Sequence, residues 1–266
     1  MAIAIVVLLL ARVIPLLDRI PPTAIALLGA IAALIAAMPE GASANRLILI
    51  RTFVTAAIVT LACIAIGLPF AMVAASVQGW RRQLLLGAVL LPLWTSLLVR
   101  TAAWYIVLQD NGLINATLKG LGIISGPIPL MFNRLGVVIA MTHVLLPFMV
   151  LPIFSVLIAI PKNLMPAAAS LGAHPLRAFF HVLLPLSMRG VVSGALLVFM
   201  AALGYYITPA LIGGANDQMI SSVIAYYATA AANWGMAGAL GLVLLTATIL
   251  LYAVYIRLAS DREQPT

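Results

Sequence analysis

The sequence has little charge and only one cysteine. Charged residues make up 8% of its 266 residues, against roughly 25% in soluble domains. A surface with so little charge could not stay hydrated, so the composition excludes an ordinary soluble protein. A single cysteine also excludes an internal disulfide framework, and Cys63, which lies within an apolar run, is expected to be a small buried residue.

The sequence also lacks the common motifs of enzymes and metal sites. It contains no GxxxxGK[ST] phosphate loop and no GxSxG nucleophile motif. Its three histidines have neither HExxH spacing nor a cysteine partner, which argues against a metal site. We therefore predict that the chain is not an enzyme, has no catalytic residue, and holds no metal or cofactor itself.

Acidic residues are few and are poorly placed for an ion-coupled carrier. Nearly all lie in loops or at the ends of apolar segments, at Asp18, Glu40, Asp110, Asp217, Asp261 and Glu263. Carriers driven by protons or sodium usually hold a carboxylate deep within a span. We therefore expect another subunit to supply the energy for any transport.

Long apolar segments are what the chain has instead. Hydrophobic residues make up 65% of it, and its mean hydropathy is +1.21. These segments are long enough to cross a bilayer, so the sequence predicts an all-α, polytopic helical membrane protein. Candidate spans are residues 1–17, 22–38, 53–76, 84–108, 135–160, 188–212 and 236–258. The first two are short, so the number and orientation of membrane segments before residue 46 stay open.

The net charge of +8 does not indicate binding to nucleic acid, because the basic residues are dispersed along the chain. In membrane proteins Lys and Arg mark the cytoplasmic loops. With residues 161–187 in the cytoplasm, that side holds nine basic residues: Arg12, Arg19, Arg81, Arg82, Lys162, Arg177, Arg189, Arg257 and Arg262. The outer side holds four: Arg46, Arg51, Lys119 and Arg134. The asymmetry favours this orientation.

The segment LMPAAASLGAHPLRAFFHVLLPLSMRG, residues 164–190, is too elaborate for a simple connection. Its pattern predicts two short helices joined at Gly172, which lies where a C-terminal cap needs a left-handed residue. Pro175 suits the first position of the second helix, and Pro185 is expected to end it, with the next span beginning near Ser187.

Apolar side chains of this segment suggest what it touches. Phe179 and Phe180 are expected to project as large apolar anchors, the residue class that dominates protein interfaces. Periodicity alone equally allows an amphipathic helix that lies on the bilayer surface. The spacing of the segment's residues favours the first interpretation.

That spacing resembles the signature loop of importer-type ABC permeases, which reads EAA, three residues, Gly, nine residues, then Ile or Val, any residue, and Leu-Pro. The matching positions are Ala167, Ala168, Gly172, Val182, Leu184 and Pro185. Pro166 replaces the family's Glu, and its effect stays open. The resemblance implies a coupling loop that docks on an ATPase through these residues together with Phe179 and Phe180.

Three further stretches narrow the resemblance. LLPLWTSLLVRTAAWYIVLQDNGLIN (90–115), HVLLPFMVLPI (143–153) and LGYYITPALIGG (203–214) are similar to polyamine-type permeases, the membrane subunits of spermidine/putrescine importers. The likeness implies N-terminal membrane segments over 1–45, a permease core over 46–258 that contains the 161–187 coupling loop, and a cytoplasmic tail over 259–266. It also implies the type I ABC importer permease fold, with about six transmembrane helices, in the bacterial inner membrane.

The resemblance implies partners as well. These are two copies of an ATPase subunit that binds ATP and Mg, a second permease subunit, an extracytoplasmic solute-binding protein and membrane lipid. The alternatives are a permease for another solute, such as an opine, an amino-acid derivative or a phosphonate, and, from another class, a stand-alone secondary carrier. Substrate and sister permease are not identified by this chain.

Four residues are candidates for the translocation pathway. Arg100 lies within a predicted span, so it is either a pathway or gate residue or a snorkelling arginine with a structural partner. Tyr205, Tyr206 and Thr208 lie beside Pro209, which is expected to interrupt the 188–212 span at depth. A helix broken within the membrane must line protein or water, which favours a pathway at this point.

Overall fold

The computed structural model describes residues 43–161, 163–214 and 216–260, and these ranges are helical without a strand. The expected spans at 1–17 and 22–38 and residues 261–266 of the expected tail lie outside the described residues. In order, the elements are α3 (Ser43–Ser76), α4 (Trp80–Trp94), α5 (Leu97–Leu108), α6 (Leu113–Gly120), α7 (Arg134–Ala159), α8 (Leu164–Ser170), α9 (Pro175–Ala178), a π-helical turn (Phe179–Leu183), α10 (Leu184–Leu203), α11 (Ile207–Ile212), α12 (Ile220–Thr229) and α13 (Trp234–Ser260).

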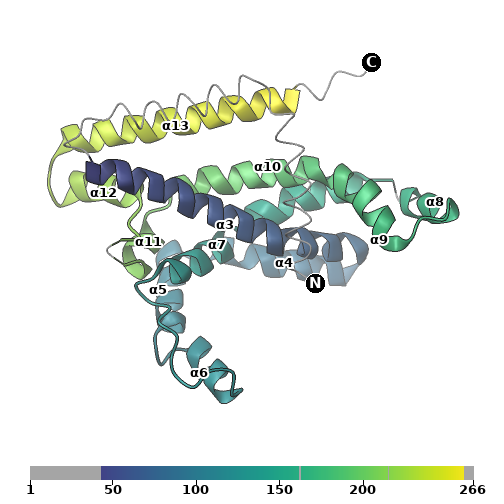
Figure 1. The fold of residues 1–266 in the computed structure, drawn as a ribbon, viewed down its shortest axis with the longest axis horizontal. Coiled ribbons are helices and arrows are strands. Elements are labelled where there is room, and N and C mark those ends of the chain that lie inside the picture. Colours follow the sequence, from purple (N-terminus) through teal and green to yellow (C-terminus); the bar gives the residue numbers. More distant parts are fainter. Residues whose placement is uncertain (1–42, 162, 215, 261–266) are drawn as a thin grey trace.

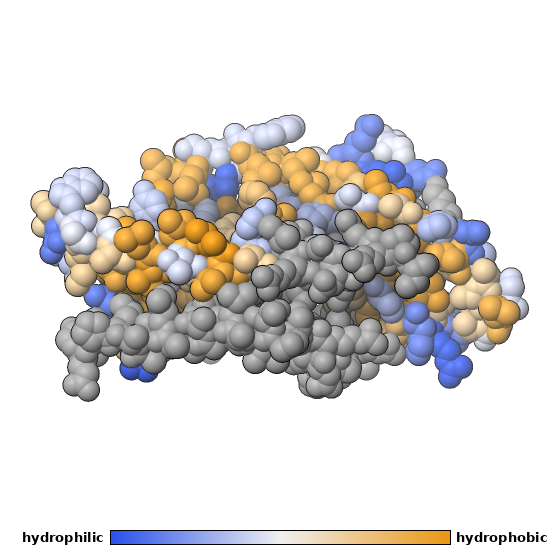
Figure 2. Space-filling model, turned by 90° about the horizontal axis from the view of Figure 1, so that it is seen from above, coloured by the Kyte–Doolittle hydropathy of each residue, from blue (hydrophilic) through white to orange (hydrophobic). Residues whose placement is uncertain are grey.

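Long helices that run side by side form the body of the structure (Figure 1). Four are long and apolar enough to cross a membrane: Asn45–Ser76, Arg134–Ala159, Pro175–Leu203 and Trp234–Ala253. A fifth span is possible if α4 and the helical segment after it are counted together. Apolar side chains cover much of the coloured surface in Figure 2, and the larger hydrophilic groups lie toward its two ends. The prediction of an all-α polytopic membrane protein is confirmed.

Helix α7 is the centre of the packing, with α3 on one side and α10 on another. Met141, Leu145, Met149 and Ile153 recur every four residues and are almost completely buried, as expected for the inward face of a helix. Cys63 of α3 packs into the same core, so the expectation that it is buried is confirmed.

Two glycines allow α10 to approach α7 closely. Gly190 and Gly194 are four residues apart, so they lie on one face of α10. A Cβ at Gly190 would lie 2.8 Å from the Cα of Ile153, and one at Gly194 would lie 2.9 Å from the sulfur of Met149. Such small-residue pairs let transmembrane helices pack backbone to backbone.

The span expected over residues 84–108 is not one continuous helix. The chain breaks after Trp94 and resumes at Leu97, and the two parts are bent by 102°. Thr95 and Ser96 at the break have extended ψ angles of 148° and 139°. Figure 1 shows α4 along the bundle and α5 turned across its end.

The expected span 188–212 is interrupted, as the position of Pro209 predicted. Helix α10 ends at Leu203, and α11 begins at Ile207. Proline has no N–H, and its ring crowds the carbonyl four residues earlier, here that of Tyr205. The 20 residues of α10 are about 30 Å long, close to the thickness of a bilayer's hydrocarbon core. The break therefore follows a helix long enough to cross that core, and the depth expected for it stays a prediction.

The second helix of the 161–187 segment does not end at Pro185. Residues Pro175–Leu203 form one continuous helix, in which Phe179–Leu183 make a π-helical turn. The N–H of Leu184 bonds to the carbonyl of Phe179, five residues back. This wider turn accommodates the ring and missing N–H of Pro185, so the helix continues instead of stopping.

The two ends of the bundle carry different connections (Figure 1). Helices α8 and α9 lie at one end, and α5, α6, α11 and α12 lie at the other. Helix α6 has 8 residues and α12 has 10, so neither is long enough to span a membrane. The connections between α5 and α7 and between α11 and α13 therefore each contain a short helix that does not cross the membrane.

Candidate functional site

The corner between α8 and α9 has the cap that the sequence predicts. Gly172 has a φ of +81°. Its N–H bonds to the carbonyl of Ala169 at 2.9 Å, and the N–H of Ala173 bonds to that of Ala168 at 3.0 Å. This pair of bonds closes the end of α8 and requires a residue in the left-handed region at the corner, which explains the glycine.

The outer face of α8 is open. Ala167 and Gly172 are exposed, and Ala168 is half-buried. No atom of the described residues lies within 4 Å of a Cβ built on Gly172. Pro166, in the position of the family's Glu, is exposed, and its carbonyl accepts a hydrogen bond from the Ser170 hydroxyl at 3.1 Å. Small side chains therefore leave the backbone of this corner accessible to another surface.

Phe179 and Phe180 do not project from the segment, and the expectation that they do is wrong. Their rings contact each other edge to face, with centroids 4.9 Å apart, and both pack against the main core. The cause is the continuous helix, which turns these side chains back onto the bundle. The most exposed large apolar side chains of the segment are Leu171 and Leu176, which are 89% and 63% exposed. Leu171 lies at helical spacing from Leu164 and Ala168, and this spacing is the sequence pattern that marks it as part of an apolar stripe.

The last residues of the signature, Val182, Leu184 and Pro185, lie where the 161–187 segment joins α10. Leu184 is buried, Val182 is half-buried and Pro185 is exposed. Val182 belongs to the π-helical turn, and the other two begin α10. These residues connect the projecting corner to the transmembrane helix.

At the other end of the bundle, α5 and α11 bring two broken spans into contact. The hydroxyls of Thr101 and Thr208 are 3.4 Å apart. Thr208 is 1% exposed, so it packs between the helices and does not line an open surface. Tyr206 is 45% exposed, and Tyr205 is half-buried against the core. Of the three candidates beside Pro209, Tyr206 presents the most side chain.

Arg100 has a structural partner at the α4–α5 break. Its Nη2 donates to the carbonyl of Thr95 at 2.7 Å, and its Nε donates to the Thr95 hydroxyl at 3.2 Å. A cation at the C-terminal end of a helix also interacts favourably with the helix dipole. Of the two interpretations of Arg100, the geometry favours the structural one.

Trp104 lies close to Arg100 in α5 and reaches α7. Its indole N–H donates to Nδ1 of His143 at 3.2 Å, and the two rings meet edge to face with centroids 5.4 Å apart. The contact ties α5 to the central helix. Sequence alone does not predict this contact, because Trp is also common at membrane interfaces without such a partner.

The carboxylates within the described ranges lie at the end of the bundle that carries α6 and α12 (Figure 1). They are Asp110 and Asp217, both in the connections beyond the spans. Asp217 forms a 3.4 Å ion pair with Arg134, at the start of α7. The described parts of the spans therefore offer a solute aromatic, hydroxyl and carbonyl groups and no carboxylate.

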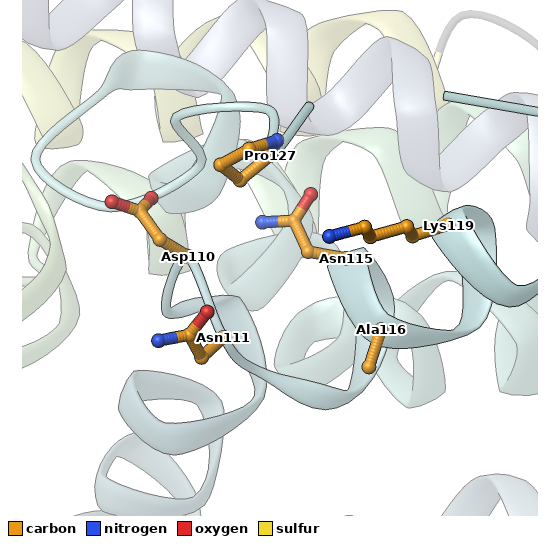
Figure 3. Close-up of a pocket in the computed structure, with 6 residues that line it drawn as sticks. All are labelled: Asp110, Asn111, Asn115, Ala116, Lys119 and Pro127. Atoms are coloured by element: carbon orange, nitrogen blue, oxygen red, sulfur yellow. The ribbon is translucent and has the colours of Figure 1, made fainter. Parts of the chain in front are cut away.

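A pocket of about 180 Å³ lies in the connection between α5 and α7. It is lined by Asp110, Asn111, Asn115, Ala116, Lys119 and Pro127 (Figure 3). Asn115 is buried and bonds to both the N–H and the carbonyl of Ile128, at 2.9 and 3.0 Å. These two hydrogen bonds hold α6 against the extended stretch near Pro127 and give the pocket its shape.

Comparison with known proteins gives a consistent result. The family described as "Binding-protein-dependent transport system inner membrane component" matches residues 25–262. The spermidine/putrescine permease PotB of Haemophilus influenzae is 36% identical over 200 residues, which cover 75% of this chain and 70% of that protein. PotB of Escherichia coli is 36% identical over 210 residues, covering 79% and 76%.

A more distant relative and a solved structure extend the comparison. The molybdenum permease ModB of Mycobacterium bovis is 34% identical over 152 residues, covering 57% of this chain and 56% of that protein. The structure of a bacterial alginate ABC transporter, in complex with an alginate-loaded periplasmic protein, aligns with a TM-score of 0.62 and 15% identity. The alignment covers 83% of this chain and 80% of that one, which shows a shared fold.

These matches confirm the predicted permease fold and the polyamine-type resemblance. The chain belongs to the family of binding-protein-dependent transport system inner membrane components, as a multi-pass permease of the bacterial inner membrane.

Proposed function

We propose that this chain forms half of the translocation pathway of an ATP-driven importer for polyamine-type solutes. The observation that carries the proposal is its 36% identity, over three quarters of its length, to permeases named for spermidine and putrescine. The other half of the pathway comes from a second permease subunit. An extracytoplasmic binding protein delivers the solute to the end of the bundle that carries α6 and α12.

The free energy of ATP hydrolysis is coupled to transport at the opposite end of the bundle, which carries α8 and α9. Two copies of a partner ATPase bind ATP and Mg, and one of them docks on the corner formed by Ala167, Ala168 and Gly172, with Leu171 and Leu176 as apolar contacts. The exposed backbone at Gly172 and the two exposed leucines support this arrangement. Apolar side chains that insert into a partner's pocket are typical anchors of such interfaces.

At the outer end, Tyr206 is the residue best placed to meet a cationic solute. Its side chain is exposed beside the break in the helix. The face of an aromatic ring attracts an ammonium group, by about 0.5–2 kcal/mol according to how far the group is desolvated. A polyamine can thus be bound and released without a carboxylate from this chain.

A second candidate substrate class is a solute that carries an anionic group, such as an opine, an amino-acid derivative or a phosphonate. One observation favours it: Arg100 is a charged residue within a predicted span, and the described parts of the spans hold no carboxylate. Arg100 is already bonded to Thr95, however, which leaves less of its hydrogen-bonding capacity for a solute.

The test is reconstitution of the complete complex with its binding protein in proteoliposomes that contain ATP. We expect uptake of radiolabelled spermidine or putrescine and ATPase activity that rises with the loaded binding protein. Uptake of a phosphonate or an opine, with no uptake of either polyamine, would instead support the second candidate. Transport by this chain without an ATPase would contradict both.

A further inference from the structure

Two consecutive serines of α12 bond to two consecutive carbonyls at the break between α10 and α11. The hydroxyl of Ser221 donates to the carbonyl of Tyr205 at 2.7 Å, and that of Ser222 donates to the carbonyl of Tyr206 at 3.2 Å. The serines lie 16 residues further along the chain than the tyrosines. A short helix of the outer connection thus holds the break in the span.

The Ser221–Tyr205 bond replaces a helical hydrogen bond that cannot form because residue 209 is proline. In an unbroken helix, the carbonyl of Tyr205 would accept from the N–H of residue 209. Residue 209 is proline, which has no N–H. A buried carbonyl without a partner is unfavourable by about 1–3 kcal/mol, and Ser221 supplies the missing donor. The carbonyl of Tyr206 differs, because it also accepts from the N–H of Ala210 at 3.0 Å.

Helix α12 is itself fixed at its first residue. The N–H of Ile220 donates to the hydroxyl of Thr52 in α3 at 2.8 Å, and both residues are fully buried. The Thr52 hydroxyl in turn donates to the carbonyl of Ile48, at 2.8 Å. A chain of polar contacts therefore runs from α3 through α12 to the break, and a displacement of α12 would act directly on Tyr205.

We propose that Ser221 is a positioning residue for transport. Its hydroxyl fixes the position of the Tyr205 carbonyl and thereby the conformation of the Tyr205–Tyr206 break. The inference rests on the proposed function in one respect, that this break lines the pathway. Ser221 acts through the backbone of Tyr205 and does not touch the solute. Ser222 has a smaller effect, since its carbonyl partner keeps a helical bond when the serine hydroxyl is removed.

The experiment compares three variants of the reconstituted complex with the wild type: S221A, S221T and T229A. Thr229 is the matched control because it lies in the same helix and its hydroxyl bonds only to a carbonyl of α12 itself, that of Ala225. We expect S221A to lower spermidine turnover per assembled complex by about tenfold, the effect of removing one good hydrogen bond from a required geometry. S221T should restore most of it, and T229A should match the wild type.

A merely structural role predicts a different pattern. In that case S221A would reduce the amount of assembled complex and its melting temperature, while turnover per complex would remain that of the wild type. Wild-type turnover in S221A, or failure of S221T to restore it, would overturn the inference.

A second readout separates this inference from the choice of substrate. Tyr206→Cys is labelled with a cationic, membrane-impermeant thiosulfonate in otherwise wild-type and S221A backgrounds; Cys63 is buried and contributes little. We expect faster labelling in the S221A background, because the break is no longer held. Equal rates would contradict the role of Ser221, whether or not the complex transports polyamines. Lack of polyamine uptake by the wild type would count against the proposed function alone.

Discussion

At the scale of single residues, a substitution of Gly172 would strain the backbone without causing a steric clash. Its φ of +81° is unfavourable for other residues, but a Cβ would meet no atom of the described residues. A substitution there is therefore expected to destabilise the corner by about 1 kcal/mol through the backbone alone. Any larger effect on transport must come from a surface outside the described residues that approaches the corner.

We predict that Gly172→Asp abolishes co-purification of the ATPase while the permease still inserts into the membrane. The substitution places a side chain and a charge on the exposed corner where docking is proposed. The measurement is the ratio of ATPase to permease after purification in a gentle detergent.

Gly122 provides a matched control for this prediction. It has a φ of +70°, and a Cβ added to it would meet open space. It lies between α6 and α7, at the end of the bundle opposite the Gly172 corner (Figure 1). Gly122→Asp should therefore retain the ATPase. If Gly172→Asp also retains it, the coupling role assigned to this corner is wrong.

Tyr206→Ala should lower spermidine uptake without any change in subunit assembly. The substitution removes an exposed ring at the outer end of the span, where we propose that the cation is attracted. Initial uptake rates at several concentrations of loaded binding protein would measure the effect, which we expect to be about tenfold. Tyr226→Ala, which removes another exposed ring, is the control. Equal uptake by both variants would place the pathway elsewhere.

At the scale of helices, the sequence predicts where unbroken spans lie and fails where their backbone is rearranged. The span expected at 135–160 is found at Arg134–Ala159, because apolar character and length determine it. The break after Trp94 has no proline or glycine at residues 95 and 96. It is held by Arg100, whose bonds to Thr95 depend on a geometry that a linear pattern does not contain.

The coupling segment shows the same limit. Proline usually ends a helix, so the expectation at Pro185 followed the common rule. The chain instead widens one turn, and this moves Phe179 and Phe180 from the expected surface onto the core. The cap at Gly172 could be predicted, because it depends only on neighbouring residues and on one left-handed backbone angle.

We predict that Gly194→Val prevents correct packing of α10 on α7. A Cβ alone would lie 3.0 Å from the carbonyl oxygen of Met149, and valine adds two methyl groups beyond it. Overpacking of this kind typically costs about 1–3 kcal/mol. The expected result is a lower melting temperature and loss of monodisperse protein in detergent. Gly241→Val, in α13 with open space around its Cβ, should behave as the wild type, and equal stability of the two variants would contradict the close packing.

At the scale of the whole molecule, the helices differ in how far the chain itself covers them. Residues inside the structure bury 56% of the apolar window of α7 but only 17% of that of α13. Among the described residues, α7 is thus the central helix, whereas most of α13 is left uncovered. The broad apolar surface is the expected state of one subunit of a membrane complex.

The charge asymmetry of the loops gives a prediction about orientation. Lys119 in α6 and Arg177 in α9 are exposed at opposite ends of the bundle. Lys119→Cys should react with an impermeant maleimide in intact spheroplasts, and Arg177→Cys should react only after permeabilisation. The reverse pattern would invert the orientation inferred from the Lys and Arg count.

The continuity of residues Pro175–Leu203 allows this helix to transmit a displacement along its length. Measured along the helix axis, its 29 residues extend about 43 Å, at 1.5 Å per residue. A tilt of about 5° at one end would move the other by about 4 Å over that length, more than half the pitch of one helical turn. Where its helical hydrogen bonds stop, beyond Leu203, such a displacement is expected to reach the Tyr205–Tyr206 break, reduced by any bending at the π-helical turn Phe179–Leu183.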